Sequence, residues 1–108
     1  MTILIKGGTV ISSTGADLAD VLIDGEIIVA VLSPGSDLAV SAENGAERVI
    51  DASDRYVIPG GVDVHTHMSL PFGGTVASDD FETGTRAAAW GGTTTIVDFA
   101  TQTYGENV

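Results

Sequence analysis

The order strand, loop, helix, strand is the feature that most restricts how this chain can fold. Residues 62–66 are apolar enough for a strand, and the run TTTIVDF at 93–99 is rich in β-branched residues. Between them a Gly/Pro-rich loop leads to Ser78, which we expect to cap a helix over 79–90. Two neighbouring strands connected through a helix run parallel. The segment therefore predicts the start of an α/β fold built on a parallel sheet.

The first 58 residues have another pattern, in which short apolar runs alternate with Gly, Ser and Asp turns. The clearest element is a hairpin around Asp24-Gly25, a pair suited to the positive φ angles of a type I′ turn. The small, polar residues 34–47 predict a surface loop. We therefore expect two parts: a small antiparallel β-sandwich-type module over 1–58, and the first βαβ portion of a larger domain over 59–108.

Composition narrows the classes of partner. The net charge of −11 would repel phosphate backbones and anionic lipid, so neither nucleic acid nor a membrane is an expected partner. The chain has no cysteine, which excludes disulfides and thiolate metal sites. Its longest apolar run, 27–32, is far too short to span a bilayer, and no signal-peptide core is visible. We expect a soluble, cytoplasmic protein.

The chain's two histidines lie one residue apart in PGGVDVHTH, residues 59–67. Side chains alternate along a strand, so Asp63, His65 and His67 share one face, with the two histidine Cα atoms about 6.6 Å apart. At that spacing both imidazoles can reach one zinc ion at roughly 2.0–2.1 Å. The pair also lies at the carboxyl end of the strand, where parallel α/β folds gather active-site groups. The alternative is a polar strand end whose histidines are satisfied by hydrogen bonds.

Longer stretches carry a family resemblance. The segment VIPGGVDVHTHMSLPFGGTVASDDFETGTRAAAWGGTTTIVDFA, with ILIKGGTVI and RVIDASDRYVIPGG ahead of it, resembles the cyclic amidohydrolases, above all the dihydropyrimidinase and hydantoinase group. The resemblance implies a (β/α)8 (TIM) barrel beside a small β-sandwich, and a binuclear zinc site bridged by a carboxylated lysine. It also implies metal-dependent opening of a dihydropyrimidine or 5-substituted hydantoin ring to an N-carbamoyl amino acid.

The same resemblance suggests roles for individual residues. His65 and His67 would ligate the more buried metal. Asp63 would either orient one of the two imidazoles without binding the metal itself, or form an ordinary hydrogen bond at the strand end. Leu70 and Phe72 would form an apolar wall for the ring substituent, or simply pack within their loop. Asp98, from its place at the end of the second expected strand and not from the resemblance, would face the pocket or be only a polar strand terminus.

Ser69 separates this chain from the dihydroorotases, which resemble it but typically carry an arginine at that position. Three alternatives stay open: an allantoinase- or dihydroorotase-type enzyme, a non-catalytic relative acting in assembly, and a self-contained acidic β-rich binding module. The intact H-x-H pair argues against the assembly proteins, and the incomplete βαβ architecture argues against the module.

The ligand count shows what is missing. A catalytic zinc site keeps about three protein ligands, whereas this chain has two histidines. Its only lysine, Lys6, lies in the first expected strand and is no candidate for the bridging carboxylated lysine. A TIM barrel also takes roughly 250 residues. We therefore expect the N-terminal part of a longer enzyme, a homo-oligomer (a tetramer by resemblance) when full length. The 108-residue chain alone should be inactive and poorly stable or self-associating.

Overall fold

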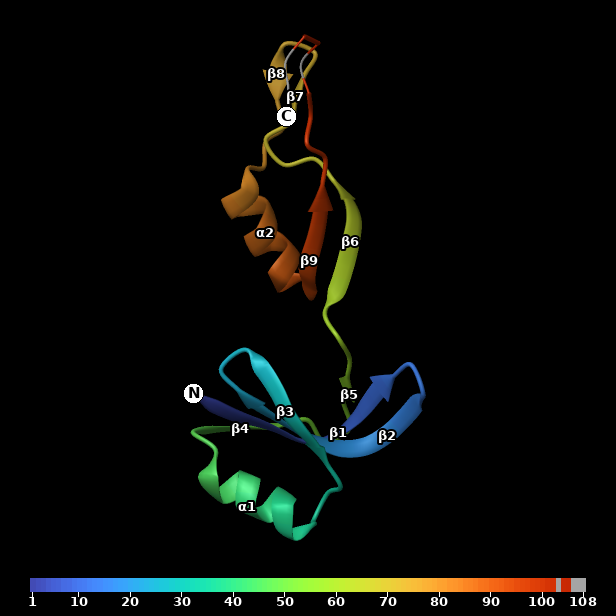
Figure 1. Ribbon diagram of the computed structural model, residues 1–108, viewed down its shortest axis with the longest axis vertical. Coiled ribbons are helices and arrows are strands. Elements are labelled where there is room, and N and C mark those ends of the chain that lie inside the picture. Colours follow the sequence, from blue (N-terminus) through green and yellow to red (C-terminus); the bar gives the residue numbers. More distant parts are fainter. Residues whose placement is uncertain (103, 106–108) are drawn as a thin grey trace. The chain divides into compact units, whose positions relative to one another are not determined.

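The computed structural model describes residues 1–102 and 104–105, which form two compact units, Met1–Pro59 and Gly60–Val108 (Figure 1). The described part of the first unit contains β1 (Thr2–Ser12), β2 (Gly15–Asp24), β3 (Ile27–Leu32), α1 (Asp37–Gly45), β4 (Arg48–Asp51) and β5 (Tyr56–Val57). The second contains β6 (Gly61–Thr66), β7 (Pro71–Phe72), β8 (Thr75–Val76), α2 (Phe81–Trp90) and β9 (Thr93–Asp98).

The first unit is built on one sheet with the strand order β3-β2-β1-β4, and β5 also pairs with β1. The hairpin at Asp24-Gly25 is confirmed, because β2 and β3 pair antiparallel around it and Gly25 has a φ of 60°. The antiparallel pairing expected for this unit is confirmed for β1, β2 and β3 but is wrong for β4 and β5, which both run parallel to β1. The described residues of this unit form a single mixed sheet. Helix α1 lies between β3 and β4, and such a crossover element is what a parallel strand requires.

The expected loop over 34–47 is also wrong, because α1 occupies most of it. Ser36 is the N-cap, and its Oγ accepts a hydrogen bond of 3.2 Å from the Ala39 N–H. Asp37 places a negative charge in the first turn, where the helix dipole favours it. Ala39 is buried, so one small side chain anchors the helix. Capping and dipole effects thus support a helix that hydrophobicity alone does not mark.

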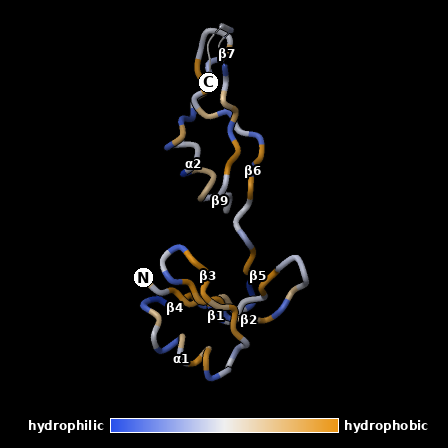
Figure 2. The backbone as a smooth tube through the Cα atoms, viewed as in Figure 1, coloured by the Kyte–Doolittle hydropathy of each residue, from blue (hydrophilic) through white to orange (hydrophobic). Residues whose placement is uncertain are grey.

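The core of the first unit is thin. Figure 2 shows hydrophobic residues concentrated along β1, β2 and β3. Leu4 is the only large side chain among the described residues that is completely buried, at 0% exposed. Around it the buried apolar residues of this unit are small: Ala19, Val21, Ala39 and Ala52. The stability of this unit therefore depends heavily on a single leucine.

The second unit confirms the expected βαβ order, because β6 and β9 pair in parallel on either side of α2 in the sequence. The helix starts later than expected: its N-cap is Asp80, not Ser78. Asp80 accepts from the Thr83 N–H at 2.8 Å, while the Thr83 hydroxyl accepts from the Asp80 N–H at 3.1 Å. This reciprocal capping box satisfies two helix N–H groups at once and outcompetes Ser78.

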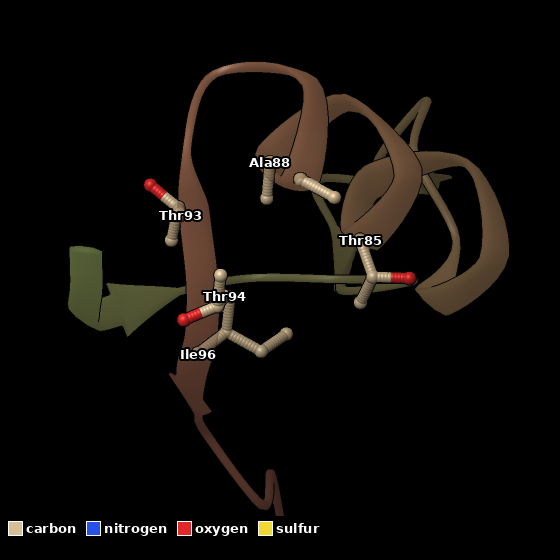
Figure 3. A pocket seen from close by; sticks show the side chains of 6 residues that line it. Thr85, Ala88, Thr93, Thr94 and Ile96 are labelled. Atoms are coloured by element: carbon tan, nitrogen blue, oxygen red, sulfur yellow. The ribbon is translucent and has the colours of Figure 1, made fainter. Parts of the chain in front are cut away.

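Helix α2 and β9 enclose a shallow pocket of about 240 Å³ (Figure 3). Its lining consists of small and β-branched side chains: Thr85, Ala88, Ala89, Thr93, Thr94 and Ile96. The expected Gly/Pro loop before α2 contains the two-residue strands β7 and β8, which pair antiparallel. Across residues 1–102 and 104–105, no helix is both long and apolar enough to cross a membrane.

Candidate metal centre

The two histidines meet at the carboxyl end of β6. His65 lies in the strand and His67 follows its last residue. Their Nε2 atoms are 3.1 Å apart, and the rings meet edge to face with centroids 4.9 Å apart and an interplanar angle of 79°. Both side chains are exposed, whereas Thr66 between them is buried. The alternation of a strand thus places both imidazoles on the face opposite Thr66.

This arrangement suits two ligands of one ion. Two nitrogens bound to a tetrahedral zinc at roughly 2.0–2.1 Å lie roughly 3.3–3.4 Å apart. The observed separation of 3.1 Å is close to that value and involves the same nitrogen of each ring. In the described residues, however, no group of three or more histidine, aspartate or glutamate side chains could hold a metal. The described part of the chain therefore supplies a pair of ligands and not a complete site.

Asp63 contacts the main chain of His65. Its Oδ1 accepts a hydrogen bond of 3.1 Å from the His65 N–H. The pairing register between β6 and β9 also shifts between Asp63 and Thr66, so the ladder is irregular where His65 lies. Such irregularities redirect side chains and are frequent beside active sites. Asp63 thus supports His65 through its backbone in this structure.

Asp98, the last residue of β9, holds the chain on both sides of His67. Its Oδ2 accepts from the Met68 N–H at 2.8 Å and from the Thr66 hydroxyl at 2.9 Å. The hydrogen bond from Met68, joined by that from Thr66, holds the pKa of Asp98 below its usual value despite opposing desolvation. The carboxylate is therefore ionised at neutral pH and links the end of β9 to the histidine segment.

Phe99 was not among the residues expected from the sequence. Its ring centroid lies 4.8 Å from that of His65 and 4.8 Å from that of His67. It stacks on His67 at 27° and is tilted by 53° against His65. The available signal was its place directly after Asp98, at the carboxyl end of the strand parallel to β6.

The other candidate residues differ in their exposure and backbone conformation. Leu70 is half-buried and Phe72, in β7, is 80% exposed. Ser69 adopts a positive φ of 53°. Lys6 belongs to the first unit, where its Nζ pairs with Glu43 at 2.6 Å. The hydrogen bond to Glu43 raises the pKa of Lys6, which keeps the amine cationic.

Comparison with known proteins finds relatives with similar sequences. No family model matches the sequence. The chain is 58% identical over 105 residues to the D-hydantoinase of Streptomyces coelicolor, covering 97% of this chain and 22% of the relative. It is 56% identical over 107 residues to the D-hydantoinase of Geobacillus stearothermophilus, covering 98% of this chain and 21% of the relative.

Solved structures agree with the sequence matches. The dihydropyrimidinase of Brevibacillus agri superimposes with a TM-score of 0.85 at 51% identity, covering 98% of this chain and 22% of that structure. The chain thus spans about a fifth of the length of the relatives it matches, at their N-terminal part.

Proposed function

The chain belongs to the family of D-hydantoinases and dihydropyrimidinases, and on this basis we propose that it forms part of a metal-dependent hydrolase that opens a cyclic amide. The observation that carries the proposal is the pair of imidazole Nε2 atoms, 3.1 Å apart, at the carboxyl end of β6. A parallel strand presents its functional groups at that end. In the complete protein, β6, α2 and β9 would begin a TIM barrel.

The proposed substrates are dihydropyrimidines and 5-substituted hydantoins, which yield N-carbamoyl amino acids on hydrolysis. Relatives in the group are named for both substrate types. Ser69 stands where dihydroorotases typically carry an arginine that binds the substrate carboxylate. Its presence favours a substrate with an uncharged ring substituent. Leu70 and Phe72 would offer that substituent an apolar wall. An exposed phenylalanine in a short hairpin can fulfil this role once a ligand covers it.

His65 and His67 would hold a metal ion, for which zinc is our expectation, and further ligands would come from outside the described residues. A bound metal would supply Lewis-acid polarisation of the amide carbonyl and a lowered pKa for its water. The chain's own part is to bring two neutral imidazoles to one point. Their Nδ1 atoms must then carry the protons, so that both Nε2 lone pairs face the ion. The complete protein would be a cytoplasmic homo-oligomer.

The test uses the complete protein with His65→Ala and His67→Ala made separately. Each substitution removes one ligand, so we expect bound zinc and hydrolysis of hydantoin and dihydrouracil to fall together. Metal content is measured by mass spectrometry, and turnover is followed on a panel that includes allantoin and dihydroorotate. Glu82→Gln, on the exposed surface of α2, serves as a control and should change neither. Histidine variants that keep both zinc and turnover would contradict the ligand assignment.

A further inference from the structure

We propose that Asp98 and Phe99 are positioning residues for the histidine pair: Asp98 fixes the main chain around His67, and Phe99 holds both imidazole rings. The inference rests on the proposed function, since it concerns how the two rings are prepared to bind a metal. Asp98 is the last residue of β9, the strand parallel to β6, and Phe99 follows it directly. Neither is itself proposed as a ligand.

The argument for Asp98 comes from the position of its two donors. Its Oδ2 accepts from Thr66 at 2.9 Å and from the Met68 N–H at 2.8 Å, one residue before and one after His67. His67 lies beyond the last residue of β6, where strand pairing no longer fixes the backbone. Thr66 is only 9% exposed, so its hydrogen bond is shielded from competing water. One carboxylate oxygen therefore holds the backbone at the point where strand pairing ends.

Phe99 acts on the rings themselves. Both imidazole centroids lie 4.8 Å from the Phe99 centroid, within the range of favourable aromatic contacts. Rotation of either imidazole about its side-chain torsions would separate the Nε2 atoms, and it would also break the contact with Phe99. The shared phenylalanine thus favours the rotamers that bring the two nitrogens to 3.1 Å. A pair already ordered in this way loses less freedom when an ion binds.

Zinc affinity of the metal-free complete protein tests the proposal. Zn²⁺ alone is titrated in competition with a chromophoric chelator. Loss of groups that orient metal ligands typically costs about 10–100-fold in affinity, and we expect a loss in this range for Asp98→Ala. Asp98→Asn keeps an acceptor oxygen and should lose less. Asp17→Ala, an exposed strand aspartate in β2, is the matched control and should bind zinc like the wild type.

Phe99→Leu has its own control in Phe81→Leu, because the two phenylalanines are similarly exposed at 51% and 53%. Phe99→Leu should weaken zinc binding and Phe81→Leu should not. A second measurement needs no metal: the ring current of Phe99 should shift the Hε1 resonances of His65 and His67. Those shifts should disappear in Phe99→Leu while the thermal midpoint changes little. Loss of the shifts shows that the Phe99 ring lies against both imidazoles. A role limited to overall stability would lower the midpoint and leave the zinc affinity of the folded protein unchanged.

The outcomes separate the two proposals. If His65→Ala and His67→Ala lose zinc while Asp98→Ala and Phe99→Leu bind it as tightly as the wild type, the positioning role is refuted and the proposed function stands. If the histidine variants also retain the zinc affinity of the wild type, the proposed function itself is refuted. Should Asp98→Ala not fold, Asp98→Asn and Thr66→Val decide, because each alters one side of the same contact. Unchanged zinc affinity in both would refute the role of Asp98.

Discussion

Substitution of Leu4 by alanine should cost the first unit most of its stability. Leu4 lies in β1 between Leu22 of β2 and Val49 of β4, and it is 0% exposed. The change removes three carbon groups at about 0.8 kcal/mol each, or about 2.4 kcal/mol of transfer free energy. The cavity left behind raises the expected loss to about 3–5 kcal/mol. A domain of this size has a total stability of about 3–9 kcal/mol.

Leu18→Ala provides the matched comparison, because Leu18 is a strand leucine of the same sheet that is 62% exposed. If the transfer free energy is scaled by the buried fraction of the Leu18 side chain, the expected loss of unfolding free energy is about 1 kcal/mol or less. Denaturant unfolding of both variants is followed by far-UV circular dichroism. The change in the denaturant midpoint, multiplied by a common m-value, gives the change in the free energy of unfolding. Losses of equal size for the two variants would refute the conclusion that Leu4 is the centre of the core.

Two further predictions concern α2. In Gly84→Ala the new Cβ would press against the Met68 Sδ, but that flexible side-chain end can move, and helix propensity gains about 1 kcal/mol. We therefore expect a small stability change with a large shift of the Met68 methyl NMR signal, and an unmoved methyl would contradict the packing. The Thr83 N–H lowers the pKa of Asp80, so the stabilisation by this cap is complete above about pH 4 and is lost as pH falls through the lowered pKa. Asp80→Asn caps without titrating, and its thermal midpoint should therefore fall less steeply in acid than that of the wild type.

The βαβ unit could be predicted because several local signals agree. The β-branched run of β9, the Gly-Gly stop after α2 and the connection length all favour the same topology. The helix start was placed two residues early because Ser78 and Asp80 are both good N-cap residues. Only Asp80 has a threonine three positions later that completes a capping box. Sequence patterns thus identified the element, while a pairwise side-chain contact set its boundary.

Helix α1 was missed because it lacks the pattern on which helix prediction depends. Ala39 is its only buried residue, while Leu38 and Val40 on either side are 70% and 49% exposed. Without an apolar stripe the segment resembles a loop, and only Ser36 and Asp37 mark its start. The error extended to the sheet, because the parallel direction of β4 depends on the crossover that α1 provides.

The surroundings of the histidine pair could not be predicted because they depend on an irregular register. Between β6 and β9 the offset of partner residues is 33 at Asp63–Ile96 but 32 at Thr66–Asp98. A regular ladder continued from Asp63 would place Asp98 opposite His65, on the imidazole face, which is the pocket-facing position considered from the sequence. The one-residue shift instead pairs Asp98 with buried Thr66 and leaves the next residue, Phe99, against the rings. Strand alternation brings the two imidazoles together. The register shift then determines that Asp98 supports the main chain around them and that Phe99 contacts their rings.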